Sequence, residues 1–108
     1  MAGGGVPSTS GKNKPATSGT TYGRQVLEST TEAERIFSLG IESTSVLIQA
    51  NPNNSDVVYV GWDNSVDADS GVILEAGTSI SLDVDLSQQN VFALPASADD
   101  DVRFLVME

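Results

Sequence analysis

The sequence of 108 residues contains no cysteine and no histidine. This absence excludes a disulfide framework, a zinc finger and any catalytic scheme that depends on a thiolate or an imidazole. A metal ion would be held by oxygen atoms. No apolar run approaches the roughly 20 residues that cross a bilayer, and the first residues lack the charged and apolar regions of a signal peptide. We expect a soluble chain with no signal peptide and no membrane partner.

Positive charge is scarce and unevenly placed. Five Lys and Arg stand against 15 Asp and Glu, which gives a net charge of −10. Residues 1–24 hold three of the cations and no acid (+3), whereas residues 25–108 hold two cations and all 15 acids (−13). Nucleic-acid binding needs clustered Lys and Arg, so we expect no nucleic-acid partner. The length allows one domain at most.

The first 23 residues differ in kind from the rest. They are rich in Gly, Ser and Thr and have few large apolar side chains to offset the entropy of ordering. We expect residues 1–23 to form a flexible arm in the isolated chain. The arm is either an unstructured terminus or a segment that orders on a neighbouring subunit. Its candidate contact residues are Val6, Lys12, Lys14 and Tyr22.

Beyond the arm, apolar residues recur with a period of two. In residues 79–86, Ile80, Leu82 and Val84 alternate with Ser and Asp, as in a half-buried strand. Turn residues separate the candidate strands, and Ala76-Gly77 predicts a hairpin between two of them. The expected strands are 24–28, 34–39, 44–50, 56–62, 72–75, 79–86, 90–94 and 102–107. Residues 24–108 are therefore predicted to be all-β, as a compact β-sandwich or jelly-roll-like barrel of about eight short strands.

Two acidic clusters are candidate cation sites. Asp63, Asp67 and Asp69 lie in a loop between expected strands, where alternating oxygen ligands are a weak signal for Ca²⁺. The EF-hand spacing and its bidentate Glu are missing, so a solvated hairpin loop is the favoured interpretation. Asp99, Asp100 and Asp101 precede the last strand. A solvated turn is favoured there, with a cation shared between subunits as the alternative.

Trp62 and the many Ser residues are the remaining candidates for chemistry. An indole at a strand end can stack on a sugar ring, although a cap on the core is the commoner role. Catalysis by Ser lacks a base, because there is no His and the two Lys residues lie in the arm. We therefore expect a protein that binds rather than catalyses, without a cofactor.

Three segments carry a recognisable pattern: VLIQANPNNSDVVYVG at 46–61, GVILEAGTSISL at 71–82 and DVRFLV at 101–106. Together they resemble small structural proteins of tailed viruses, in a likeness that covers roughly residues 44–106. The resemblance implies a compact β-sandwich that coats or joins parts of a virion, with no catalytic residues to carry over. The acid excess is similar to that of haloarchaeal proteins, whose carboxylates keep the surface hydrated in concentrated salt.

The expected function is a virion structural protein, either a head decoration (cement) protein or a minor capsid protein. Its partners would be the major capsid protein and other virion subunits, with the arm contacting neighbours. Trimers or pentamers are the oligomers that the resemblance implies. The chain would be made in the host cytoplasm and lie on the capsid surface. The alternatives are a carbohydrate- or receptor-binding module of a fibre or spike that uses Trp62, and a tail or neck adaptor.

Overall fold

The computed structural model describes residues 21–36 and 42–107, and regular structure in these ranges is confined to strands. The strands are β2 (Thr21–Val26), β3 (Glu34–Ile36), β4 (Ser45–Ala50), β5 (Val58–Gly61), β6 (Val72–Leu74), β7 (Ser79–Leu82), β8 (Val91–Pro95) and β9 (Asp101–Met107). In strands such as β4 and β7, apolar residues alternate with less buried ones, because successive side chains of a strand point to opposite faces.

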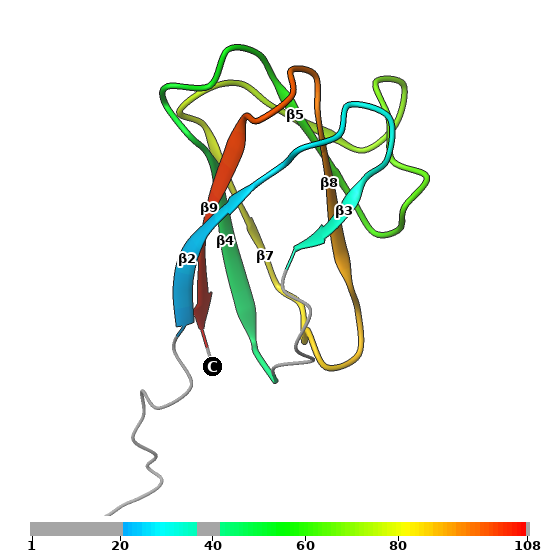
Figure 1. The fold of residues 1–108 in the computed structure, drawn as a ribbon. Coiled ribbons are helices and arrows are strands. Elements are labelled where there is room, and N and C mark those ends of the chain that lie inside the picture. The colour runs from blue at the N-terminus through cyan, green and yellow to red at the C-terminus, as the bar shows by residue number, and fades with distance from the viewer. Residues whose placement is uncertain (1–20, 37–41, 108) are drawn as a thin grey trace, which may run out of the picture.

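The eight strands form two four-stranded sheets, ordered β2-β9-β4-β7 and β3-β8-β5-β6, that pack face to face (Figure 1). Every pairing is antiparallel. The pairs are nested along the chain: β5 with β6, β4 with β7, β3 with β8 and β2 with β9. Successive pairs fall in opposite sheets, as in an antiparallel ribbon rolled up on itself. This is the jelly-roll arrangement, and the prediction of an all-β sandwich is confirmed.

The core lies between the inner faces of the two sheets. In β4, Val46 and Ile48 are fully buried, whereas Leu47 between them is only half-buried. Across the core, β5 directs Val58 and Val60 inward. Fully burying a side chain of this size contributes about 1.5–3 kcal/mol, so the inward-facing positions dominate the stability of the fold.

The predicted hairpin between 72–75 and 79–86 is wrong, because β6 and β7 lie in different sheets. The turn itself is present: the Thr78 N–H donates to the Glu75 carbonyl at 2.9 Å, and Gly77 has a φ of +85°. Two further bonds tie the turn to Ala50. Its carbonyl accepts from Gly77 N–H at 2.9 Å and its N–H donates to Thr78 O at 2.9 Å. After β6 the chain therefore crosses to the other sheet, where β7 pairs with β4.

Many strand boundaries differ from the sequence prediction by one or two residues, and two within the described residues differ by more. Strand β2 begins at Thr21 rather than at residue 24. Ladder pairing of the 79–86 segment ends at Leu82, although Val84 beyond it remains buried. Its carbonyl accepts a 2.6 Å hydrogen bond from the Ser43 hydroxyl, which replaces a ladder partner.

Candidate functional site

The outward surface of sheet β2-β9-β4-β7 differs from the rest of this acidic domain. The inward side chains of β9 and β4, such as Val102, Val106 and Val46, are fully buried, so their neighbours along each strand point outward. We call this surface the arginine face. It is formed by Tyr22, Arg24, Leu47, Gln49, Arg103, Leu105 and Met107.

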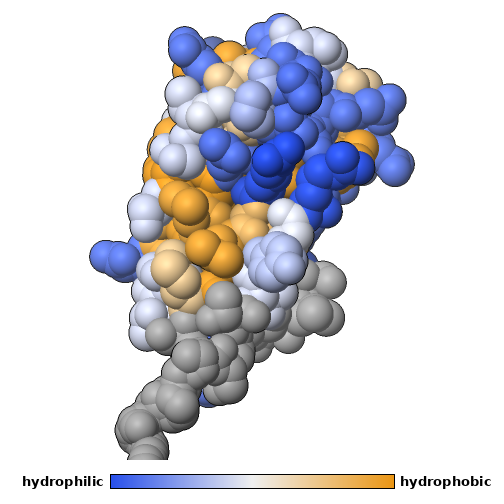
Figure 2. Space-filling view, turned by 90° about the vertical axis from the view of Figure 1, so that its left-hand side faces the viewer, coloured by the Kyte–Doolittle hydropathy of each residue, from blue (hydrophilic) through white to orange (hydrophobic). Residues whose placement is uncertain are grey.

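An apolar row crosses the arginine face. Tyr22 of β2 pairs with Leu105 of β9, and Leu105 pairs with Leu47 of β4. Tyr22 is 79% exposed, and the two leucines are half-buried. A shallow depression of about 180 Å³ adjoins the row and is lined partly by the leucines. Hydrophobic side chains gather on this side of the molecule, next to strongly hydrophilic ones (Figure 2).

A second row, of polar side chains, runs beside the apolar one. Arg24 pairs with Arg103, and Arg103 pairs with Gln49. Both arginines are exposed enough to reach a partner, and they are two of only five cations in the sequence. The arginine face therefore combines apolar area with positive charge on a domain whose net charge is strongly negative.

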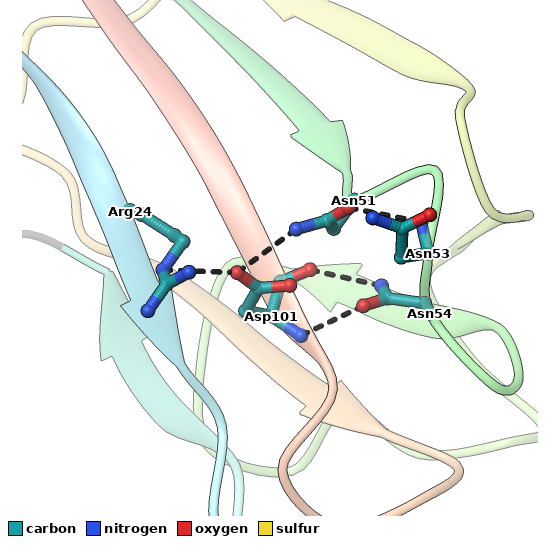
Figure 3. Close-up of polar contacts among 5 residues, drawn as sticks. All are labelled: Arg24, Asn51, Asn53, Asn54 and Asp101. Carbon is teal, nitrogen blue, oxygen red and sulfur yellow. Dashed lines mark hydrogen bonds and ion pairs between the residues drawn. The ribbon is translucent and has the colours of Figure 1, made fainter.

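Asp101 holds one edge of the arginine face in place (Figure 3). Its Oδ2 atom lies 3.1 Å from Arg24 Nε and accepts from Asn51 Nδ2 at 3.2 Å. The Asn54 side chain forms two hydrogen bonds with the main chain of Asp101. Asn54 Nδ2 donates to Asp101 O at 2.9 Å, and the Asp101 N–H donates to Asn54 Oδ1 at 2.9 Å. The Asn-rich turn, the start of β9 and β2 are thus fixed relative to one another.

The prediction of a solvated turn at residues 99–101 is wrong for two of its three acids. Asp100 is 6% exposed and Asp101 7% exposed. Asp100 Oδ1 accepts from the Ser55 N–H and Oδ2 from the Asp56 N–H, each at 2.9 Å. Ser55 and Asp56 are themselves exposed, but they precede β5 and have no strand partner, so the Asp100 carboxylate is the acceptor for both N–H groups. Repulsion among adjacent acids does not decide the conformation, because the carboxylates of Asp100 and Asp101 each have their own donors.

Only Asp99 of this run matches the expectation of an exposed turn residue. It is exposed and adopts a φ of +70°, a conformation that Asp tolerates better than most residues. The cation shared with a neighbouring subunit stays untested, and two of the carboxylates proposed for it are already engaged in hydrogen bonds with the turn at residues 51–56.

The candidate Ca²⁺ residues lie in the loop that joins β5 to β6, which are paired neighbours. Asp63 Oδ1 accepts from the Ser65 hydroxyl at 2.5 Å and from its N–H at 3.0 Å. These two bonds, the hydroxyl first, lower the pKa of Asp63. Asp67 Oδ1 accepts from the Asp69 N–H at 2.9 Å. Within residues 21–36 and 42–107, no three acidic side chains are placed to hold one metal ion.

Trp62 stands at the end of β5 and is 52% exposed. It separates two depressions. One, of about 120 Å³, is apolar and includes Val72 and Leu82. The other, of about 240 Å³, has polar side chains such as Asp63 and Ser70 in its wall. The indole is therefore partly open to solvent, with an apolar surface on one side and hydrogen-bonding groups on the other.

Of the predicted contact residues in the arm, Val6, Lys12 and Lys14 lie outside the residues that the structure describes. Tyr22 lies in β2 and is the most exposed residue of the apolar row. Sequence reasoning identified Tyr22 but missed Leu47, Leu105 and Arg103 as its neighbours. The last strand is largely apolar on both sides, which predicts a central strand or a contact surface, and β9 is indeed central in its sheet.

The described residues include no helix long and apolar enough to cross a membrane. No family model matches the chain, and neither curated proteins nor solved structures yield a match. The arginine face and Trp62 are therefore interpreted from their own chemistry.

Proposed function

We propose that the protein is a virion structural subunit that binds the outer head lattice, as a decoration or minor capsid protein, and that it docks through the arginine face. The observation that carries this proposal is the apolar row of Tyr22, Leu105 and Leu47 beside Arg24 and Arg103. The resemblance of residues 44–106 to virion proteins and the jelly-roll fold, which recurs in viral capsid domains, support it by analogy.

The composition of the arginine face suits a protein partner. Tyr and Arg are enriched among the residues that dominate binding energy, because each combines a large apolar area with a polar end. Apolar area removed from water contributes about 25 cal/mol per Å². Arg103 would attract an acidic surface and fix its orientation through hydrogen bonds, with Arg24, which is paired with Asp101, beside it. An acidic capsid shell is therefore the partner that this face fits.

The arm adds a second contact in the same place. Tyr22 belongs to the arginine face, and residues 1–20 precede it directly in the chain. These residues carry Lys12 and Lys14 and no acid. An arm that orders on a neighbouring subunit would extend the contact. Ordering the arm costs roughly 1–2 kcal/mol per residue, and the contacts that the arm forms must offset this cost. Arm and face then act together.

Purified virus particles from the source of the gene test the proposal. We expect them to contain the chain, and antibodies against it to label the outer head. Added protein should rebind to particles stripped of it, whereas Arg103→Glu and Tyr22→Asp should bind at least tenfold more weakly. Arg35→Glu, an equal charge change at an exposed position of the other sheet, is the matched control. Particles without the chain would contradict the proposal, and label at the tail or neck would support the adaptor alternative.

Carbohydrate binding is a second candidate, favoured by Trp62 alone. Its half-exposed indole offers a stacking surface, and Asp63 and Ser70 stand on one side with hydrogen-bonding groups. A glycan array screened with and without Ca²⁺ tests this function. Binding that Trp62→Ala abolishes and Trp62→Phe largely retains would support it. No binding in any condition would reject it and leave the structural role.

A further inference from the structure

Strand β6 is an edge strand whose protection is its length of three residues. It ends the sheet β3-β8-β5-β6, with β5 as its one neighbour in the sheet. All three of its residues are apolar, and Val72 and Ile73 are 43% and 56% exposed. Natural edge strands usually carry a charge, a proline or a bulge that prevents pairing with another chain. Of the other edge strands, β2 and β3 each carry an arginine, whereas β7 carries neither charge nor proline but alternates apolar residues with serine.

Open space lies beside this strand. A groove of about 460 Å³ runs between β6 and β7, the edge strands of opposite sheets. Val72, Ile73 and Leu74 line one side and Ile80 lies on the other, and the polar residues Glu75, Thr78 and Ser79 complete the lining. The apolar cleft beside Trp62 shares Val72 and Ile80 with this groove. The edge of β6 is thus flanked by accessible apolar surface.

We propose that β6 pairs antiparallel with β6 of a second copy of this chain, about a twofold axis at Ile73. The two four-stranded sheets would join into one continuous sheet. In this register Ile73 opposes Ile73, and Val72 opposes Leu74 of the second copy. Gly71 opposes Glu75, so that no acid lies opposite an acid. Cross-strand apolar pairs stabilise a sheet, whereas like charges directly opposite destabilise it.

A second copy fits this edge better than other occupants. Residues 70–74 carry no charge, so a strongly charged partner would find no counterpart there. Residues 1–20 have only Val6 as a large apolar residue after Met1, which is too little to cover Val72 and Ile73. The same strand in a second copy supplies matching apolar side chains and matching main-chain groups by symmetry.

The expected dimer is weak and depends on salt. Pairing of two three-residue strands and their flanks buries less than a standard interface, so we expect a dissociation constant in the micromolar range. Each copy carries a net charge of −10, and the resulting repulsion is screened by salt. Raising the salt concentration should therefore tighten the dimer.

Sedimentation equilibrium of the full chain, over a concentration series at low and high salt, tests the proposal. We expect a monomer–dimer equilibrium that Ile73→Lys weakens at least tenfold, because a lysine protects an edge strand. Val26→Lys is the matched control: Val26 is apolar, 38% exposed and on the opposite edge strand β2. A monomeric wild-type chain at every concentration and salt, or an Ile73→Lys dimer of unchanged affinity, would overturn the proposal.

Cross-linking gives an independent readout. Because the chain has no cysteine, Ile73→Cys introduces a single thiol. In the proposed dimer, the twofold axis places this thiol opposite the same thiol of the second copy. Mild oxidation should give a covalent dimer, whereas Val26→Cys should stay mostly monomeric. A chain that dimerises only after removal of residues 1–20 would show that the arm covers β6, and would overturn the proposal. These experiments use the isolated chain, so they are independent of binding to a virion.

Discussion

The guanidinium of Arg24, on edge strand β2, lies 3.1 Å from the carboxylate of Asp101, the first residue of β9. The Arg24 side chain is 62% exposed and that of Asp101 is 10% exposed. An exposed partner is screened by solvent, so the pair contributes less than a fully buried one. Its structural effect is to hold β2, and with it Tyr22, at the edge of the arginine face.

Arg24→Met should lower the free energy of unfolding by about 1 kcal/mol, because a largely buried carboxylate loses its ion-pair partner while the aliphatic packing stays. Urea denaturation followed by circular dichroism measures the change. Arg103→Met is the matched control on the same face and should stay within about 0.5 kcal/mol of the wild type. Equal effects of the two substitutions would show that the Asp101 pair contributes nothing specific.

Asp100→Ala should be more damaging. It removes two part-buried hydrogen bonds to a carboxylate, from the Ser55 and Asp56 N–H groups, and a hydrogen bond to a charged group contributes about 1.5–3 kcal/mol. Asp99→Asn, in the same turn, is the control. Asn tolerates a positive φ as Asp does, so little change is expected. If the two variants unfold at the same urea concentration, Asp100 is not a structural residue.

Ser43→Ala should destabilise the segment that follows β7. The Ser43 hydroxyl donates to Val84 O at 2.6 Å and accepts from the Leu86 N–H at 3.1 Å, and Ser43 is buried. Loss of both bonds should cost about 1–3 kcal/mol. Hydrogen exchange should show early opening of residues 84–86. Thr44→Ala, at an exposed position, should leave exchange unchanged, and the same result for Ser43→Ala would contradict the assignment.

Acid should weaken the fold partly through Asp85. Its pKa is lowered from the ordinary 3.8, chiefly by the Ser87 hydroxyl, which donates to Oδ1 at 2.7 Å, and then by the Ser87 N–H. A lowered pKa in the folded state means that this stabilisation is present above pH 3.8 and is lost as the pH falls through the folded-state value. The carboxylate favours the folded chain only while it is ionised.

Ser87→Ala should therefore raise the pKa of Asp85 toward its ordinary value. Titration of the side-chain carboxyl carbons by nuclear magnetic resonance measures this change. Asp63, whose pKa is lowered by Ser65 in a different loop, is an internal control and should titrate as in the wild type. An unchanged Asp85 titration would mean that the Ser87 hydroxyl is not its main partner.

The sequence predicts the strands of this fold better than their pairing. Each of the eight strands overlaps a segment predicted from the sequence: alternation indicated residues 79–86, and a β-branched and aromatic run between turn residues indicated residues 56–62. The Ala76-Gly77 turn was located, but its hydrogen bonds to Ala50 were not predictable, since Ala50 is far away in sequence. Those two bonds decide that β7 joins β4 rather than β6.

The acidic residues show the same limit. Three adjacent Asp residues look like a solvated turn, but the donors that bury Asp100 and Asp101 come from residues 51–56 and from Arg24. The arginine face was likewise only partly predictable. Tyr22 and the double apolar pattern of the last strand were visible in the sequence. That Leu47 and Leu105 form one row with Tyr22 depends on the register of three strands.

Electron cryomicroscopy of purified particles tests the central claim, docking of the arginine face on a virus head, most directly. The jelly-roll domain should appear on the outer surface of the head, with Tyr22, Leu105 and Leu47 against the shell and Arg103 next to acidic residues of the shell. Density for the domain with this row facing solvent, or heads that lack the domain altogether, would contradict the account.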